Sequence, residues 1–504
     1  METPVLVFIG FMGAGKTTGA RAAAAALGVR AIDTDREVEQ RIGTSIEDYF
    51  ASHGERAFRE IEEDVVAEVL ETPPAPVISI GGGAIGSARV RELLARHTVV
   101  MLDVDEPTAW RRAGGKRRPL ARDRERFAAL HAERAPVYEA LADAVLLDGG
   151  AETVRRAAGA LRRIPTGVKV LWAVAGGVNY PVYVGDVLDR DFWPVRGRRF
   201  MLTDETVGPV YGERIPELTA TFAMPAGEAA KTLSNAEVLL RGLAAAGMDH
   251  DDHVVALGGG VVGDVAGFCA AVYQRGVGVV QVPTTLVSQV DSAYGGKTGV
   301  DLPEGKNYVG AYHQPRAVLA DPRTLATLPA AELAAGWAEV VKTALIAGGP
   351  LWTRVRRGEG IVDRDLVLAC ARTKLAVVAG DERDAGRRQV LNLGHTVGHA
   401  IETATGYARY RHGEAVGLGL LAALTLSGQP ELRSEVSDLL SGYGLPTTLD
   451  PSVDHEAVLT AVQRDKKRRG GRVGFVLVEA PGDVRTGAPV AERDVRTALG
   501  GLMK

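Results

Sequence analysis

The chain has 504 residues, a formal net charge of −4, 46% hydrophobic residues and 24% charged residues. This length predicts about three domains, and the composition excludes an intrinsically disordered chain. The small net charge gives no general attraction to nucleic acid or to a membrane surface.

Cysteine content and the lengths of the apolar runs indicate the cellular compartment of the protein. Two cysteines, Cys269 and Cys370, are too few to stabilise a chain of this length by disulfide bonds, which favours a reducing compartment. The apolar run at residues 5–9 is too short for a signal peptide. The longest later run, residues 415–426, falls short of the roughly 18 residues that a membrane span needs. We therefore expect a cytoplasmic protein that binds neither a membrane nor nucleic acid.

The first part of the chain, residues 1–165, alternates strand-like and helix-like patterns. Such alternation predicts a parallel sheet with helices on both faces. Pro165, Thr166 and Gly167 then predict a domain boundary. Apolar runs predict strands at residues 5–9, 31–32, 77–80 and 99–103, and helix-forming runs occupy residues 19–27 and 152–163.

A glycine-rich loop follows the first predicted strand. Residues 10–17 read GFMGAGKT, which is the pattern G-x-x-x-x-G-K-T. Backbone N–H groups of such a loop surround phosphates, the lysine reaches the β- and γ-phosphate oxygens, and the threonine hydroxyl holds Mg²⁺. The loop therefore predicts a phosphoryl-transfer site, with Lys16 and Thr17 in these two roles.

Charged residues further along this part are candidates for the same site. Asp33 and Asp35 follow the second strand, which suits one carboxylate near Mg²⁺ and one on a hydroxylated substrate. Either aspartate could instead be a helix N-cap. Arg59, Arg118 and Arg134 could hold a substrate carboxylate or the transferred phosphoryl group.

On these motifs, residues 1–165 resemble the shikimate kinase family. The stretches that carry the resemblance are GFMGAGKTT, DTD at 33–35, GERAFRE around Arg59, GGG at 81–83, RRPL at 117–120 and ERAPVY at 133–138. The resemblance implies ATP as phosphoryl donor and catalytic roles for Lys16 and Asp35. It also implies shikimate binding by Asp35, Arg59, Gly81, Gly82 and Arg134, ATP binding by Gly13, Gly15, Lys16, Thr17, Thr18, Arg112 and Arg118, and Mg²⁺ binding by Thr17 and Asp33.

A second α/β pattern begins at residue 168, and from about residue 326 the sequence becomes mainly helical. Residues 258–263 read GGGVVG after a β-branched run, which satisfies G-x-G-x-x-G. The next strand, residues 277–282, ends in Pro283 without the acidic residue that a Rossmann fold places on the ribose. We interpret the motif as a pyrophosphate-binding turn with Asp264 beside it; the alternative is a turn that needs glycine only for a positive φ.

Three histidines and a group of lysines follow. His395 and His399 are spaced i and i+4 on one helical face, and His412 comes soon after, which predicts a metal site suited to Zn²⁺. The residue types leave open whether the ligands are three histidines or two histidines and a carboxylate, with the third histidine as an acid/base.

Lysine is rare in this chain, with 11 lysines against 48 arginines, yet the motifs contain Lys297, Lys306, Lys342, Lys374, Lys466 and Lys467. So many ammonium groups indicate an acidic substrate such as a phosphorylated sugar acid.

Residues 168–504 resemble the 3-dehydroquinate synthase family. The motifs are GEAAKTL, GGGVVGDVAGF, QVPTTLVSQVDSAYGGKTGVD, GKNYVGAYHQP, GWAEVVKTALI, LNLGHTVGHAIE and HGEAVGLG. The resemblance implies bound NAD⁺, zinc or cobalt on Glu339, His395 and His412, proton transfer by His399, and catalytic roles for Lys297, Lys342 and Arg388. It implies NAD⁺ contacts from Asp204, Glu228, Lys231, Gly258, Gly259, Gly260, Asp264, Thr284, Thr285, Asp291, Lys297 and Lys306. Substrate contacts would come from Lys297, Lys306, Asn307, Lys342, Lys374, Arg388, Asn392, His399 and Lys466 or Lys467.

Together the resemblances imply a bifunctional enzyme that phosphorylates shikimate to shikimate 3-phosphate and cyclises 3-deoxy-D-arabino-heptulosonate 7-phosphate to 3-dehydroquinate with release of phosphate. They imply three parts, at residues 1–165, 168–325 and 326–504, and a homodimer formed through the synthase part. The alternatives are another sugar phosphate cyclase or a metal- and NAD-dependent alcohol dehydrogenase in the second part, and a nucleotide-binding regulatory module in the first.

Overall fold

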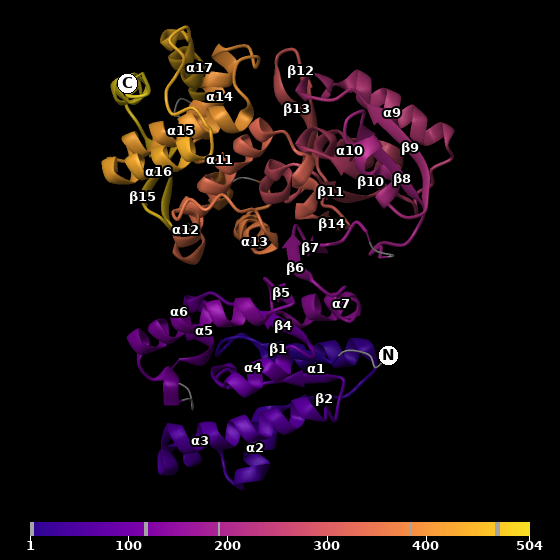
Figure 1. Cartoon of the computed structure of the whole chain (residues 1–504), viewed down its shortest axis with the longest axis vertical. Helices are drawn as coiled ribbons and strands as arrows, with labels where there is room; N and C mark the ends of the chain where they lie inside the picture. Colours follow the sequence, from indigo (N-terminus) through magenta and orange to yellow (C-terminus); the bar gives the residue numbers. More distant parts are fainter. Residues whose placement is uncertain (1–4, 115–118, 190–191, 384–385, 469–473, 504) are drawn as a thin grey trace. The chain divides into compact units, whose positions relative to one another are not determined.

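The computed structural model describes residues 5–114, 119–189, 192–383, 386–468 and 474–503, without the side chains of Pro119 and residues 465–468. Two compact units, Met1–Tyr183 and Val184–Lys504, make up the chain (Figure 1). The boundary expected at residues 165–167 precedes strand β6 (Val168–Ala175), which pairs with a strand of the first unit. The end of the first functional part therefore stays a prediction.

The first unit contains a parallel sheet in the order β2-β3-β1-β4-β5-β6, with β7 next to β6. This confirms the predicted α/β fold with a glycine-rich loop between β1 and α1. The strands are β1 (Leu6–Ile9), β2 (Ala31–Asp33), β3 (Val77–Ser79), β4 (Thr98–Leu102), β5 (Ala144–Leu146), β6 and β7 (Val178–Gly185). The helices are α1 (Lys16–Leu27), α2 (Thr34–Ile42), α3 (Ile46–Glu71), α4 (Ala88–Leu94), α5 (Glu106–Ala113), α6 (Arg124–Leu141) and α7 (Ala151–Leu161).

The second unit begins with another parallel sheet, in the order β14-β11-β10-β8-β9. Its strands are β8 (Arg199–Asp204), β9 (Leu218–Met224), β10 (His253–Gly258), β11 (Gly278–Pro283) and β14 (Ala317–Ala320). The connecting elements are α8 (Gly208–Tyr211), α9 (Leu233–Ala245), α10 (Gly260–Val272) and an antiparallel hairpin of β12 (Lys297–Leu302) and β13 (Gly305–Tyr312).

The rest of the second unit is helical, as expected. Its helices are α11 (Ala330–Ala347), α12 (Gly349–Val355), α13 (Arg364–Gly380), α14 (His395–Ala404), α15 (His412–Leu426), α16 (Pro430–Gly442), α17 (His455–Arg468) and α18 (Glu492–Gly500). One antiparallel hairpin interrupts them, formed by β15 (Gly474–Ala480) and β16 (Asp483–Pro489). This hairpin was not among the elements expected from the sequence.

The central strands are covered on both faces. Residues 6–9 of β1 are 0% exposed, and all of β10 is buried. A parallel strand buried in this way takes apolar residues at nearly every position, which is why both strands are visible in the sequence as uninterrupted apolar runs. Among the described residues, no helix has the length and apolarity to cross a membrane.

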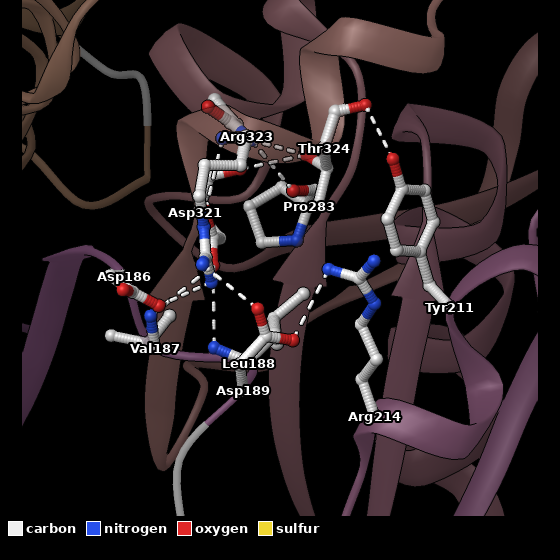
Figure 2. Close-up of polar contacts among 11 residues, drawn as sticks. Asp186, Val187, Leu188, Asp189, Tyr211, Arg214, Pro283, Asp321, Arg323 and Thr324 are labelled. Atoms are coloured by element: carbon white, nitrogen blue, oxygen red, sulfur yellow. Dashed lines mark hydrogen bonds and ion pairs between the residues drawn. The ribbon is translucent and has the colours of Figure 1, made fainter.

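A buried aspartate ties the first residues of the second unit to the end of β14. The Asp321 carboxylate is 1% exposed and accepts hydrogen bonds from the backbone N–H groups of Val187 at 3.2 Å and Leu188 at 3.3 Å. Arg323 donates to the same carboxylate at 2.7 Å and also pairs with aspartates of residues 186–189 (Figure 2). The network fixes this segment against the carboxyl end of the sheet.

A buried histidine at the start of β10 predicts acid lability of the second unit. His253 is 1% exposed and accepts a hydrogen bond from Trp193 Nε1 at 2.9 Å, and burial with the nearby Arg199 lowers the pKa of His253 to about 4. The unfolded pKa is near 6.5, so the neutral ring stabilises the fold fully above about pH 6.5 and loses that effect as the pH falls through about 4. Its contribution to the free energy of unfolding is on the order of 3 kcal/mol.

We expect His253→Gln, which keeps the acceptor for Trp193 but does not titrate, to flatten the loss of unfolding free energy between about pH 6.5 and 4. Denaturant unfolding of the full chain at several pH values measures this slope. Substitution of the exposed His250 by glutamine is the control and should leave it unchanged. Parallel slopes for the wild type and His253→Gln would contradict the prediction.

Candidate active sites

The phosphate-binding loop of the first unit requires glycine. Gly10, Gly13 and Gly15 have φ angles of 146°, 85° and 91°, which side-chain-bearing residues rarely adopt. A Cβ on Gly10 would lie 2.7 Å from the last carbonyl oxygen of β4. Lys16 begins α1, and its Nζ donates to the carbonyl oxygen of Phe11 at 3.3 Å, so the lysine reaches back across the loop. The loop amides and this ammonium can cradle a phosphate group.

A second glycine loop lies beside the first. Gly82 follows β3, and its carbonyl oxygen accepts hydrogen bonds from Arg134 Nη1 at 3.1 Å and from the Tyr138 hydroxyl at 2.5 Å. A Cβ on Gly82 would lie 3.5 Å from Lys16 Nζ. The structure therefore brings Arg134, Gly82 and the loop lysine together. In the sequence, Tyr138 was only the last residue of the motif ERAPVY, and no role was predicted for it.

A buried glutamate organises the predicted substrate residues. Glu62 is 4% exposed and pairs with Arg59. A Cβ on Gly81 would lie 2.5 Å from Glu62 Oε1 and 2.9 Å from Asp35 Oδ1, so these two carboxylates meet at the glycine, and Arg59 lies against the neighbouring Gly83. Burial raises the pKa of Glu62, against the opposing effect of Arg59. Sequence reasoning missed Glu62, although its i+3 spacing from Arg59 on a helix was an available signal.

The remaining kinase-side residues lie around the phosphate loop. Asp33 caps α2 by accepting from the Asp35 backbone N–H at 3.2 Å, which fits the N-cap interpretation and leaves carboxylate oxygen available to Mg²⁺. Arg112 on α5 donates to the carbonyl oxygen of Gly13 at 3.4 Å. Thr17 and Thr18 form the first turn of α1, whereas Arg118 lies outside the described residues.

In the second unit, the predicted cofactor residues gather at one edge of the sheet. Parallel strands place their carboxyl ends together, and ligands bind where the strand order reverses, here between β8 and β10. Asp204 ends β8, Gly258 ends β10 and Thr284 follows β11. Glu228 and Lys231 follow β9, so five expected contacts lie on this edge.

The glycine turn after β10 has the features of a dinucleotide site. A Cβ on Gly259 would lie 2.8 Å from Thr285 Cγ2, and one on Gly260 would lie 3.0 Å from Ser292 Oγ. The buried hydroxyls of Thr284 and Ser292 have no hydrogen-bond partner among the described residues. Buried polar atoms are normally paired, so a tight turn at a helix N-terminus with two unpaired hydroxyls fits a bound pyrophosphate or nucleotide.

Lys231 links this turn to the β12–β13 hairpin. Its Nζ lies 2.6 Å from Asp264 Oδ2 and donates to Asn307 Oδ1 at 2.5 Å. Burial opposes the charge of Lys231, but Asp264 outweighs it and raises the pKa of the ammonium. Burial raises the pKa of Asp264 against the effect of Lys231. Three residues expected at the cofactor or the substrate thus form one connected group.

The predicted metal ligands are close together. Glu339 Oε1 lies 3.6 Å from His395 Nε2 and 3.3 Å from His412 Nε2, and ligand atoms of all three residues lie within 4.8 Å of one another. A carboxylate with two imidazoles is a donor set that Zn²⁺ accepts. The ring centroid of His399 is 5.2 Å from that of His395 and 6.0 Å from that of His412, which leaves His399 beside the cluster.

The two ligand histidines differ in charge. Burial and the neighbouring Lys342 lower the pKa of His395 to about 3, so its ring is neutral. Burial also opposes the charge of His412, but its hydrogen bonds to Glu339 and Glu402 outweigh this and raise the pKa of His412 to about 10. The metal-free cluster therefore carries one proton that a metal ion must displace.

Two buried lysines flank the cluster. Lys342 Nζ lies 2.7 Å from Asp291 Oδ2 and also contacts Glu339, and both carboxylates raise the pKa of Lys342 against the effect of burial. Lys374 pairs with the same aspartate and donates to its carbonyl oxygen at 2.7 Å. Burial lowers the pKa of Lys374. Asp291 thus connects the turn after β11 to α11 and α13.

The other predicted residues lie around this centre. Arg388 is 2% exposed and donates to the carbonyl oxygen of Gly295 at 3.1 Å. Lys306 Nζ lies 3.1 Å from Glu228 and 3.3 Å from Glu402. Glu402 was visible only as the last residue of the motif LNLGHTVGHAIE, without a predicted role, although it is spaced i+7 from His395 on α14. Lys297 begins β12, Asn392 ends the 3-10 helix Arg387–Asn392, and the side chains of Lys466 and Lys467 lie outside the described residues.

Comparisons with known proteins match the two units. Residues 12–164 match the shikimate kinase family, residues 221–335 the N-terminal domain of 3-dehydroquinate synthase, and residues 336–468 its C-terminal domain. A 3-dehydroquinate synthase of Halorhodospira halophila (strain DSM 244 / SL1) is 45% identical over 349 residues, which are 65% of this chain and 98% of that protein.

Solved structures agree in fold with the second unit. ValA, a 2-epi-5-epi-valiolone synthase from Streptomyces hygroscopicus subsp. jinggangensis 5008 with NAD⁺ and Zn²⁺ bound, is 27% identical with a TM-score of 0.60, over 66% of this chain and 98% of that one. A 2-deoxy-scyllo-inosose synthase complexed with carbaglucose-6-phosphate, NAD⁺ and Co²⁺ has the same TM-score of 0.60 at 24% identity, over 66% of this chain and 100% of that one, and shows the fold alone.

The charge state of the histidines predicts that Zn²⁺ binding releases protons. At about pH 7, His395 is neutral and His412 is protonated, so binding should release about one proton per ion. The apparent affinity should rise about tenfold per pH unit up to about pH 10. Calorimetric Zn²⁺ titrations of the metal-free chain, in buffers that differ in ionisation enthalpy, count these protons. Heats that do not depend on the buffer would show that His412 is neutral in the free site.

Proposed function

The chain belongs to the 3-dehydroquinate synthase family and carries a shikimate kinase domain ahead of its synthase domains, and we propose that each set of residues described above serves one of these two activities. The observation that carries this proposal is the cluster of Glu339, His395 and His412 next to buried lysines and a glycine turn suited to a dinucleotide. We place the kinase at residues 1–165, the dinucleotide-binding part at 168–325 and the helical part at 326–504.

In the kinase, the loop lysine and the glycine at position 82 define where the phosphoryl group moves. Lys16 and the loop amides hold the phosphates of ATP, with Mg²⁺ on Thr17 and Asp33. Asp35, Arg59 and Arg134 bind shikimate, and Glu62 holds Arg59 in place through its ion pair. Asp35 accepts the proton of the attacking hydroxyl group, because a carboxylate at this position can orient and deprotonate it.

In the synthase, the residues fit both expected cofactors. The chemistry that Zn²⁺ (or Co²⁺) and NAD⁺ supply when bound is polarisation of a secondary alcohol and reversible acceptance of its hydride. Glu339, His395 and His412 hold the metal, and the edge formed by Asp204, Gly259 and Thr284 holds NAD⁺. His399, beside the metal ligands, moves protons, and Lys374 and Arg388 hold the anionic groups of the heptulosonate phosphate.

A related sugar phosphate cyclase activity is the second candidate, because the fold of ValA matches the same unit at 27% identity. The 45% identity to a 3-dehydroquinate synthase and the buried Arg388, suited to a carboxylated substrate, favour the first candidate. We also propose that the chain acts in the cytoplasm as a homodimer formed through the synthase part. The two free, buried cysteines are consistent with a reducing compartment.

The synthase activity is tested by NMR with the purified chain, Zn²⁺, catalytic NAD⁺ and 3-deoxy-D-arabino-heptulosonate 7-phosphate. We expect 3-dehydroquinate and an equal amount of phosphate, with no accumulation of NADH, because the hydride returns in each turnover. Accumulated NADH would instead indicate a net dehydrogenase. Turnover of a different seven-carbon sugar phosphate, with none of this one, would favour the second candidate.

Substitutions should separate the two activities. We expect Lys16→Met to lower shikimate-dependent ADP formation by roughly 100-fold or more, because it removes a charge that stabilises the transferred phosphoryl group, and to leave 3-dehydroquinate formation unchanged. Glu339→Gln should have the opposite pattern, because it weakens the metal site. Each variant is the control for the other in assays of the same preparation. ADP formation that does not depend on shikimate would favour a regulatory nucleotide-binding module.

A further inference from the structure

The side chain of Glu402 contacts a metal ligand from outside the ligand set. Glu402 lies on α14 and is 2% exposed, and its Oε2 is 3.5 Å from His412 Nδ1. The other ring nitrogen of His412, Nε2, is 3.3 Å from Glu339 Oε1. One imidazole therefore presents one nitrogen to the proposed metal ligands and the other to a buried carboxylate.

We propose that Glu402 is a positioning residue of the metal site, which holds His412 by accepting its Nδ1–H and so leaves the Nε2 lone pair for the ion. A metal-bound histidine commonly donates its other ring N–H to a carboxylate, and this contact fixes the ring orientation and makes the ligand more basic. The inference rests on the proposed function, since it takes Zn²⁺ to bind at Glu339, His395 and His412.

Lys306 keeps this carboxylate ionised. Its Nζ lies 3.3 Å from Glu402 Oε1, on the other side from His412, and 4.6 Å from the centre of the Tyr407 ring. A buried carboxylate without a cationic partner would be strongly destabilised. With Lys306 on one oxygen and His412 on the other, Glu402 can stay charged and serve as a strong acceptor.

A second metal ion is the competing explanation, because His399, Glu402 and His412 also have ligand atoms within 4.8 Å of one another. The ammonium of Lys306, 3.3 Å from Glu402, would repel another cation there. His412 would also have to give its second nitrogen to the second ion. The positioning role therefore predicts one Zn²⁺ per chain.

Zn²⁺ affinity of the full chain tests the proposal without a turnover assay. Competition with a chelator of known affinity should show Glu402→Gln binding Zn²⁺ about 10- to 100-fold more weakly than the wild type. Glu402→Asp keeps the charge but moves the carboxylate one methylene away from His412. This variant should therefore also bind Zn²⁺ more weakly, which tests the position of the carboxylate separately from its charge. The visible spectrum of the Co²⁺-loaded variants should change, since the ligand ring is no longer held.

Glu414→Gln is the matched control. Glu414 lies two residues after His412 on α15, and its carboxylate accepts from the Arg411 backbone N–H at 2.7 Å. Its replacement changes a carboxylate at the start of the same helix, but Glu414 is not among the proposed metal ligands or their contacts. We therefore expect wild-type Zn²⁺ affinity and an unchanged Co²⁺ spectrum. An equal loss of affinity in this variant would show that general loosening of α15, and not Glu402, is responsible.

The remaining outcomes are distinguishable. Wild-type affinity in both Glu402 variants, or two Zn²⁺ per chain by elemental analysis, would overturn the positioning role. A wild-type chain that binds no Zn²⁺, with Glu339→Gln indistinguishable from it, would overturn the proposed metal site itself.

Discussion

Buried carboxylates must have their charge balanced, and this requirement organises the centre of the second unit. Glu339 and Asp291 both lie against Lys342, and Asp291 also pairs with Lys374. Removing one member of such a group leaves an uncompensated buried charge and costs several kcal/mol. The ion pairs therefore lock α11, α13 and the turn after β11 together, and they hold a metal-ligand oxygen in place before any metal arrives.

Both units bring functional residues together in the same way. In a parallel sheet all strands end at one edge, so short loops that are distant in sequence become neighbours. In the first unit, the loops after β1 and β3 carry the phosphate cradle and Gly82, and Asp33 ends β2. In the second unit, the ends of β8, β10 and β11 supply the dinucleotide edge. Each site is thus assembled by the sheet, and the helices add the charged residues.

The sequence could predict those parts of the two sites whose residues lie close together in the chain at characteristic spacings. A glycine loop between a strand and a helix needs its particular residues at fixed spacing, so Lys16 was evident from the sequence. Spacing alone could not separate His395 from His399, because residues four apart share a helix face. The family resemblance made that distinction; the structure places Glu339 next to His395 and His412, and the choice of ligands stays a prediction.

Glu62 and Glu402 were missed for a different physical reason. On sequence alone, a glutamate on a helix is expected to face solvent, and only tertiary packing shows that these two are 4% and 2% exposed. Each contacts a cationic or imidazole side chain that we assign to a site, Glu62 with Arg59 and Glu402 with His412. The β15–β16 hairpin was missed because a short apolar run does not distinguish strand from helix without its pairing partner.

The division of residues between the units bears on why two activities share one chain. All site residues assigned to the kinase fall within Met1–Tyr183, and all site residues assigned to the synthase fall within Val184–Lys504, although the synthase part itself is placed from residue 168. Neither reaction produces the substrate of the other, so no intermediate has to pass between them. Since each set of residues lies in its own unit and no common intermediate exists, the chemical steps themselves gain nothing from the covalent link. What the link does fix is the ratio of the two catalysts, which are made one for one.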